Sequence, residues 1–221
     1  MKKMIYSMIG IATSLSAISA TFTTPTSKVG YAIGYQMGSS LKAQQVAFDT
    51  QAFVAGLEAS LNGTTPELTT QQMQVAMEDF RKQMTEKLNA AKQQNVDAGA
   101  AYLEKNKIAE GVHQTSSGLQ YKILTAGTGV KPAFSDTVTV DYEGTLINGT
   151  VFDSSYKRGA AATFPVNAVI AGWTEALQLM PVGSTWMLYI PSNLAYGERG
   201  AGGAIGPNQT LIFKVHLIKI N

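Results

Sequence analysis

The side chains that could take part in chemistry are mostly aromatic or aliphatic and are concentrated in the second half of the chain. A few polar residues, Asp153, Arg158 and Glu198, lie between them in the sequence. Bulky apolar residues with a few polar neighbours are typical either of a hydrophobic core or of an apolar binding pocket. Composition alone leaves both interpretations open. The apolar members are Tyr142, Phe152, Phe164, Val169, Ile170, Trp173, Tyr196, Ile205 and Phe213.

Composition excludes several other kinds of site. The 221 residues include no cysteine and two histidines, so the chain has no disulfide, thiolate ligand or cysteine nucleophile. Glycine-rich phosphate-binding motifs and the Gly-x-Ser-x-Gly element of hydrolases are also absent from the sequence. Seventeen Lys and Arg against 15 Asp and Glu give a net charge of +2, without a basic cluster. We therefore expect no metal, no cofactor and no nucleic acid partner.

The first twenty residues have the layout of a secretory signal peptide. Lys2 and Lys3 precede an apolar stretch over 4–18, and the small residues Ser19 and Ala20 follow it. The stretch is short for a membrane-spanning helix, which needs about 20 residues. We expect export with cleavage after Ala20, and an uncleaved membrane anchor is the alternative.

Residues 21–111 are expected to be helical. A first helix over 28–44 carries three glycines at intervals of four, which would let another backbone approach that face closely. A second helix, beginning at Asp49 or Thr50, is expected to stop at Gly63. The three glycines of the first helix are Gly30, Gly34 and Gly38.

A third, much longer helix is expected after a capping-box pattern, Thr69 followed by Gln72, and no proline interrupts the sequence as far as residue 110. An apolar seam at spacings of three and four runs along its first half, which indicates either a core within one chain or a homodimer interface. From Gln93 the pattern becomes polar, so we expect the second half to project as a stalk, with Gly99 as its weakest point. The seam consists of Met73, Met77, Phe80, Met84, Leu88 and Ala91.

After Gly111 the sequence changes to short alternating strands separated by turns. Residues 137–142 alternate with their valines and Tyr142 on one face, Asn148-Gly149 is a hairpin signal, and residues 173–179 form a short apolar helix. The expected fold class is α+β: an all-α dimerisation region with a long connecting helix, then an antiparallel sheet of five or six strands wrapped over one short helix. The expected domains are a signal peptide (1–20), the helical region (21–111) and the sheet domain (112–221).

Five motifs in the second half occur in the order found in FKBP-type peptidyl-prolyl cis-trans isomerases, and the resemblance covers about residues 112–221. The helical region, together with residues 117–122, resembles the two-domain exported form of this family that is named for the macrophage infectivity potentiator (Mip). The motifs are Val140-Asp141-Tyr142-Glu143-Gly144, residues 148–155, Val169-Ile170-Ala171-Gly172-Trp173, Ala195-Tyr196-Gly197 and residues 211–215.

The resemblance implies a peptidyl-prolyl isomerase with a proline pocket. Trp173 would form the floor of this pocket and Ile205 part of its rim, and the Tyr196 hydroxyl and the Ile170 backbone N–H would reach substrate carbonyls. Asp153 would either steady a carbonyl or pair with Arg158. The expected catalytic residues are Asp153, Tyr196 and Tyr142. The expected substrate-binding residues are Phe152, Val169, Ile170, Trp173, Ile205 and Phe213.

The resemblance also implies partners and a location. We expect proline-containing polypeptides as substrates, a homodimer formed by the N-terminal helices, and a pocket that could also bind the family's macrocyclic inhibitors. The protein would assist folding of exported proteins, in the periplasm or at the outer membrane or cell surface of a bacterium. A chaperone or host-interaction module that uses the same pocket only for binding is the alternative, and turnover of an X-Pro peptide distinguishes the two.

Overall fold

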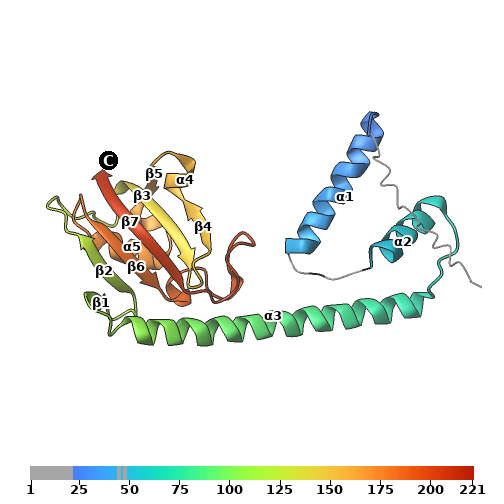
Figure 1. The fold of residues 1–221 in the computed structure, drawn as a ribbon, viewed down its shortest axis with the longest axis horizontal. Coiled ribbons are helices and arrows are strands. Elements are labelled where there is room, and N and C mark those ends of the chain that lie inside the picture. Colours follow the sequence, from blue (N-terminus) through green and yellow to red (C-terminus); the bar gives the residue numbers. More distant parts are fainter. Residues whose placement is uncertain (1–21, 44–45, 47–48) are drawn as a thin grey trace, which may run out of the picture. The chain divides into compact units, whose positions relative to one another are not determined.

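The computed structural model describes residues 22–221 apart from 44–45 and 47–48, and it divides into two compact units, residues 1–55 and 56–221. The expected signal peptide over 1–20 lies outside the described residues. Within the described ranges, no helix combines the length and the apolar character needed to cross a membrane. The described part of the first unit is mainly helical, and the second unit holds the long helix and the sheet (Figure 1).

Helix α1 (Pro25–Ala43) begins three residues earlier than expected because two local signals favour an earlier start. The Thr24 side chain accepts a hydrogen bond from the Ser27 backbone N–H at 3.1 Å, and Pro25 suits a first helical position, where no backbone donor is needed. The three glycines at intervals of four are all open, since a methyl group added at any of them would meet no atom within 4 Å. Among the described residues of the first unit, none covers the glycine face of α1.

Helix α2 (Thr50–Asn62) has the two ends that the sequence predicts. The Asp49 carboxylate accepts hydrogen bonds from the backbone N–H groups of Gln51 and Ala52 at 2.8 and 3.1 Å. At the other end Gly63 adopts a left-handed φ of 65°, a conformation that side chains disfavour, and the chain leaves the helix there.

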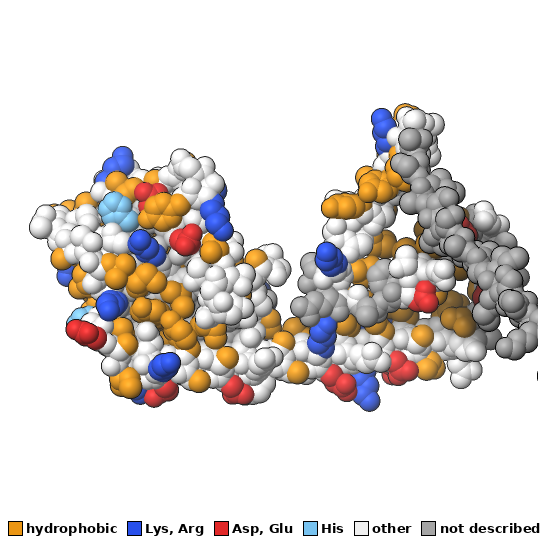
Figure 2. Space-filling model, in the orientation of Figure 1, with side chains coloured by type: hydrophobic (Ala, Val, Ile, Leu, Met, Phe, Trp, Pro, Cys, Tyr) orange, Lys and Arg blue, Asp and Glu red, His pale blue; other side chains and the backbone are white. Residues whose placement is uncertain are grey.

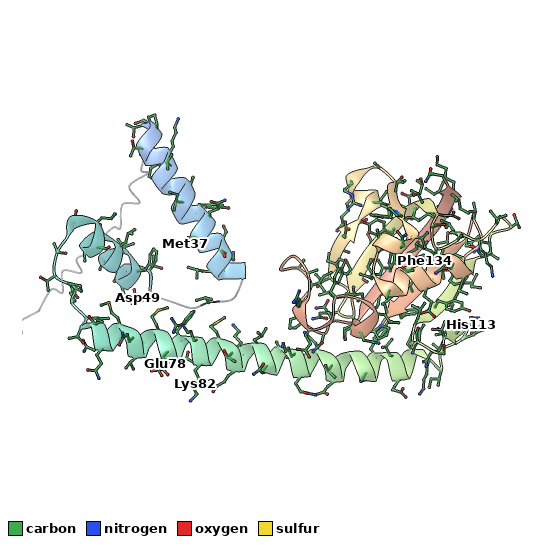
Figure 3. All side chains as sticks on the ribbon, turned by 180° about the vertical axis from the view of Figure 1, so that it is seen from behind. Met37, Asp49, Glu78, Lys82, His113 and Phe134 are labelled. Carbon is green, nitrogen blue, oxygen red and sulfur yellow. The ribbon has the colours of Figure 1, made fainter. Side chains whose placement is uncertain are left out.

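Helix α3 (Thr70–Asn106) is one continuous helix of 37 residues that starts at the expected capping box. Gln72 N–H donates to Thr69 Oγ1 at 3.2 Å, and Thr69 N–H donates to Gln72 Oε1 at 2.8 Å. Figure 3 shows Glu78 and Lys82 on one side of α3 and sulfur-bearing side chains on the other. Within the second unit, which holds α3 and the sheet, the seam residues Met73 and Met77 are 40% and 50% exposed, so no other element of that unit covers them. The choice between a core within one chain and a homodimer interface stays a prediction.

The second half of α3 is not a projecting stalk, which corrects the sequence expectation. It lies along the sheet domain (Figure 1): Lys92 pairs with Glu198, and Asn95 Nδ2 donates to the Pro207 carbonyl at 2.8 Å. Gly99 is buried against Thr210, and a methyl group placed there would come within 2.4 Å of the Thr210 hydroxyl. Gly99 is thus a close-packing position and not a bend.

The end of α3 is joined to the sheet by a buried amide. Gln120 is 2% exposed, and its Nε2 donates to the Leu103 carbonyl at 2.9 Å and to Gln114 Oε1 at 3.0 Å. Its Oε1 accepts from Asn106 Nδ2 at 2.8 Å. Because an unpaired buried amide is costly, Gln120 fixes the end of α3 on the sheet. The expected domain boundary after residue 111 stays a prediction.

The second unit contains a seven-stranded antiparallel sheet in the order β1-β2-β6-β7-β3-β4, with β5 paired to β3. The alternation read from residues 137–142 is confirmed, since every second residue of β3 is buried. The two strands that the sequence did not show, β1 and β5, have three and four residues. The strands are β1 (Val112–Gln114), β2 (Gln120–Thr125), β3 (Thr137–Leu146), β4 (Val151–Ser154), β5 (Ala162–Pro165), β6 (Thr185–Ile190) and β7 (Leu211–Ile220).

Helix α5 (Ala171–Leu179) packs closely on the sheet and completes the hydrophobic core. A methyl group added at Gly172 would come within 2.5 Å of Ile190, so the helix can approach β6 only because this residue is glycine. Trp173, Ala176 and Leu177 on α5 are buried in the same cluster as the inward-facing residues of β3, β6 and β7. This packing confirms the expected sheet wrapped over one short helix.

The contact at Gly99 gives a first prediction. Gly99→Ala adds a residue with about 1 kcal/mol better helix propensity, but overpacking a buried contact costs about 1–3 kcal/mol. Because Thr210 is buried and short, it cannot move away cheaply. We expect the free energy of unfolding, measured by urea denaturation of the full chain, to fall by about 1 kcal/mol.

The matched control is the same change in a Thr210→Ala background, where the hydroxyl is missing. There Gly99→Ala should raise the free energy of unfolding relative to Thr210→Ala alone. If Gly99→Ala alone raised the free energy of unfolding of the otherwise wild-type chain, that result would contradict the close contact between Gly99 and Thr210.

Candidate functional site

An aromatic cluster surrounds Trp173 at the first turn of α5. Trp173 is 4% exposed, and three rings meet its indole nearly at right angles. The centroid distances are 5.2 Å to Tyr142, 5.2 Å to Phe213 and 5.9 Å to Phe164, with interplanar angles of 89°, 81° and 88°. Edge-to-face contact is favourable for aromatic pairs and fixes ring orientation. The indole is therefore held rigidly at the bottom of a concave surface.

A cavity of about 380 Å³ opens above this cluster. Its volume falls in the range typical of small-ligand sites. Eight of the nine residues expected from the sequence line it, together with Phe164 and Ala168. Phe164 belonged to the apolar set read from the sequence, whereas nothing in the sequence distinguishes Ala168. The lining residues are Tyr142, Phe152, Asp153, Phe164, Ala168, Val169, Ile170, Trp173, Tyr196 and Phe213.

Ile205 is the expected site residue that does not line the cavity. It is 7% exposed and belongs to the hydrophobic core. Its backbone pairs with Ala201, with N–H to carbonyl distances of 2.8 and 3.0 Å in the two directions. Ile205 thus anchors the loop before β7, and its expected place at the rim of the pocket stays a prediction.

Gly144 makes room for two rings of the pocket wall. A methyl group there would lie 2.6 Å from Phe152 and 2.7 Å from Phe213. These two rings pack edge to face at 5.5 Å and 85°. A β-bulge between Gly144 and Thr145 shifts the β3–β4 register at the same point. The wall formed by β4 and β7 therefore depends on the missing side chain of Gly144.

One polar cluster interrupts the apolar lining. The Tyr142 hydroxyl donates to Asp153 Oδ2 at 2.5 Å, the Arg158 guanidinium donates to Asp153 Oδ1, and Arg158 Nη2 donates to the Tyr142 hydroxyl at 2.9 Å. The Arg158 guanidinium carbon also lies 5.4 Å from the centre of the Tyr142 ring, within range of a cation–π contact. The structure thus shows Asp153 paired with Arg158 at the edge of the cavity.

Helix α4 (Ser155–Arg158) is a single turn that returns Arg158 to Asp153. Its start is fixed by the Ser154 side chain, which accepts from the Lys157 backbone N–H at 3.4 Å. Ser155 is fully buried; its Oγ donates to Asp141 at 2.9 Å and accepts from the Tyr142 N–H at 2.9 Å. The short helix therefore supplies Arg158 and, through Ser155, fixes the backbone of Tyr142. These two residues are the partners of Asp153.

The polar cluster controls the protonation states at the cavity edge. Burial acts to raise the pKa of Asp153, but the hydrogen bonds from Tyr142 and Arg158 and the charge of Arg158 outweigh it, and the pKa lies below its ordinary value. Burial raises the pKa of Tyr142, and the hydrogen bond to Asp153 adds to this shift. At neutral pH the cluster therefore contains a carboxylate, a phenol that donates to it and a guanidinium.

Two further groups lie at the cavity on other elements. Ile170 precedes α5, and its carbonyl accepts from the N–H groups of Trp173 and Thr174 at 2.9 and 3.0 Å. Tyr196 precedes the short helix η3 (Gly197–Arg199), and its side chain is 42% exposed. A hydroxyl on an exposed ring next to an apolar cavity can bond a ligand without first losing a protein partner.

Comparison with protein families gives two matches that together span most of the chain. Residues 129–218 match the family described as FKBP-type peptidyl-prolyl cis-trans isomerase. Residues 26–123 match the family described as the domain amino terminal to FKBP-type peptidyl-prolyl isomerase. The first match contains every residue that lines the cavity.

Individual relatives agree with these matches. The chain is 47% identical to the outer membrane protein MIP of Legionella longbeachae, over 100% of this chain and 97% of the relative. It is 44% identical to the peptidyl-prolyl cis-trans isomerase Mip of Coxiella burnetii, over 100% and 99%. The crystal structure of FkpA from Escherichia coli matches with a TM-score of 0.66 and 35% identity, over 91% of this chain and 99% of that chain.

The polar cluster gives a second prediction. Replacing Arg158 with glutamine removes a donor and the opposite charge, while the burial that acts to raise the pKa remains. The pKa of Asp153, followed by carboxyl-carbon NMR titration, should therefore rise. Lys157→Gln is the matched control: it removes a neighbouring cation and should leave the titration of Asp153 unchanged.

The same change should alter the pH dependence of stability. A lowered pKa stabilises the fold above the unfolded-state pKa of Asp153, and this contribution is lost as pH falls through the folded-state pKa. Arg158→Gln should therefore be less stable than the wild type at neutral pH, and the two should converge in acid. A difference that persists unchanged below the folded-state pKa would contradict this assignment.

Proposed function

Because the chain belongs to the family of FKBP-type peptidyl-prolyl cis-trans isomerases, we propose that the cavity above Trp173 is its active site, in which it accelerates X-Pro bond rotation in exported or surface proteins and so assists their folding. The observation that carries this proposal is the rigid aromatic floor and walls with a single ionised cluster at the edge. A proline ring is apolar and compact, which suits such a cavity.

The chemistry of the reaction explains why an apolar pocket is sufficient. Rotation about the peptide bond has a barrier of about 18–20 kcal/mol because the twisted amide loses its resonance. The planar amide is more polar than the twisted one, so a pocket that excludes water disfavours the planar ground state relative to the transition state. Trp173 and the rings around it supply this environment. The step makes and breaks no covalent bond and needs no nucleophile.

Hydrogen bonds would hold the peptide on both sides of the rotating bond. The Tyr196 hydroxyl and the Ile170 backbone N–H would donate to substrate carbonyls, which fixes the flanking residues while the prolyl bond turns. The Asp153 carboxylate would act at the pocket edge by orienting the carbonyl dipole of the residue before proline. Its hydrogen bonds to Tyr142 and Arg158 keep this charge in one place.

We also propose export of the protein. The arrangement of Lys2, Lys3 and the apolar stretch over 4–18 supports a signal peptide, and a relative identical at 47% of positions is named an outer membrane protein. The isomerase domain would then be residues 112–221, carried by the helical region over 21–111, in the periplasm or at the cell surface.

A homodimer formed through the N-terminal helices is part of the proposal. Helix α1 exposes apolar side chains beside its open glycine face, among them Val29 at 58% and Ile33 at 57% exposure. Figure 2 shows such apolar side chains at the surface of α1. Exposed apolar surface of this kind favours association, and adaptable methionine side chains such as Met37 can fill an irregular interface. A second copy of the chain would cover this face.

The active-site proposal is tested by turnover of an X-Pro peptide. Tyr196→Phe and Asp153→Asn should each lower kcat/KM by about twofold to tenfold with the fold intact, since each loses a net hydrogen bond. Trp173→Ala should also cost about 3–5 kcal/mol of stability because the ring is buried. Tyr156→Phe is the matched control, since Tyr156 is half exposed and lies outside the cavity lining.

Wild-type protein that binds proline peptides without speeding their isomerisation would refute the enzyme mechanism and support a binding module. Loss of turnover on adding a chelator would refute the metal-free chemistry.

The dimer is tested by light scattering at about micromolar concentration, a range in which stable interfaces persist. Gly34→Leu should weaken the dimer by about tenfold or more through overpacking at a close approach. Turnover on a short peptide should stay unchanged because each pocket is complete within one chain. Gln36→Leu adds the same side chain to another face and should leave the dimer intact. A wild-type monomer, or a dimer that survives deletion of residues 21–68, would contradict the proposal.

A further inference from the structure

The loop between Tyr196 and β7 connects the cavity to helix α3. It begins at Tyr196, which lines the cavity, and ends at Thr210, which is 3% exposed. Five of the intervening residues are glycines, at positions 197, 200, 202, 203 and 206. Glycine-rich chain has high conformational entropy, so the position of such a loop must be set by contacts along its length.

Within the loop, one hydrogen bond joins its far end to the residue next to Tyr196. The Asn208 N–H donates to the Gly197 carbonyl at 2.8 Å. Asn208 has a φ of 54°, which makes it the single non-glycine residue with positive φ in the part of the chain that the structure describes. This backbone conformation is uncommon outside glycine and persists where the surroundings hold it. The segment around Asn208 thus has a defined geometry that reaches Gly197.

Helix α3 contacts this segment with three residues on one face. Lys92, Asn95 and Gly99 are spaced by three and four positions, which places them in one row along the helix. Lys92 Nζ lies 3.0 Å from the Glu198 carboxylate, and Gly99 packs against Thr210. Between them Asn95 Nδ2 donates to the Pro207 carbonyl at 2.8 Å, in a partly buried position.

These contacts form a continuous path from the helix to the cavity. The Asn95 side-chain amide donates to the Pro207 carbonyl, and the N–H of the next residue, Asn208, donates to the Gly197 carbonyl. Gly197 directly follows Tyr196 in the chain. The exposed Lys92–Glu198 ion pair adds little to this path because solvent screens it. The Asn95 hydrogen bond is partly shielded from water, so it contributes more than the ion pair to fixing the position of the loop.

We propose that α3 positions the loop that carries Tyr196, and that Asn95 is a positioning residue for substrate binding. The inference rests on the proposed function of the cavity. A loop released from α3 spends part of its time with Tyr196 out of place, and the apparent dissociation constant rises in inverse proportion to the competent fraction. The bound complex itself is unchanged. Loss of Asn95 therefore raises KM and leaves kcat as it was.

The test uses the full chain with Asn95→Ala. Alanine favours the helix more than asparagine does, so α3 itself is not weakened. We expect KM for an X-Pro peptide to rise about threefold to tenfold, as for the loss of one net hydrogen bond, with kcat unchanged. Asn95→Asp keeps the size of the side chain but not the donor and should behave like Asn95→Ala. Gln94→Ala, on the exposed side of the same turn, should behave like the wild type.

A double-mutant cycle with Tyr196→Phe identifies the route. If Asn95 acts through the Tyr196 hydroxyl, Asn95→Ala should have little further effect on KM in the Tyr196→Phe background. An effect of full size in that background would overturn the inference, and so would a wild-type KM in Asn95→Ala. Failure of the proposed function is seen separately, because Tyr196→Phe alone would then leave turnover at the wild-type level.

Amide hydrogen exchange supplies a readout that does not depend on catalysis. Asn95→Ala should speed exchange at Asn208, whose N–H bonds to Gly197, while leaving the amides of β3 and β6 protected as in the wild type. Unchanged exchange at Asn208 would show that α3 does not hold the loop and would overturn the inference.

Discussion

The pocket depends on Trp173 meeting the rings of Tyr142, Phe213 and Phe164 edge to face at the same time. These rings come from β3, β7 and β5, so the sheet must close around α5 before the indole has a defined position. Gly172 allows the helix to approach Ile190, and Gly144 allows the wall to close. The floor and two walls of the cavity are also part of the hydrophobic core. Substitutions there change stability and ligand binding together, whereas the polar edge can vary with little effect on the core.

The polar edge contributes orientation more than stability. Asp153 receives its partners from β3 and α4, and about two-fifths of its side chain is exposed. Ion pairs with this degree of exposure are worth little because water screens them. Their geometric effect is independent of that screening: one carboxylate, one phenol and one guanidinium are held in a fixed arrangement at the mouth of an otherwise apolar cavity. A substrate therefore meets a single directed electrostatic feature.

Local signals predicted most of the architecture, and the main error, at the second half of α3, arose where polar side chains bond partners that are distant in the sequence. The alternation of β3, the Thr69–Gln72 capping box and the glycine stop after α2 depend on neighbouring residues, so the sequence shows them directly. Of the nine site residues expected from the resemblance of five motifs, eight line one cavity in the structure. The polar second half of α3 was wrongly interpreted as a stalk, because Asn95 and Gln120 are accommodated by distant partners that apolar periodicity does not reveal. Strands of three or four residues, such as β1, carry too little pattern to detect.

The central position of β7 has a consequence for how the protein is made. This strand lies between β6 and β3, yet it is the last strand in chain order. While a ribosome is still synthesising residues before 211, the nascent sheet is split into two parts, and Phe213 is not yet available to close around Trp173. The sheet can therefore close only after β7 has emerged, as expected for a topology dominated by pairings distant in sequence. Until then the sheet domain has no closed core, and a segment without a closed core can still be threaded through a narrow channel.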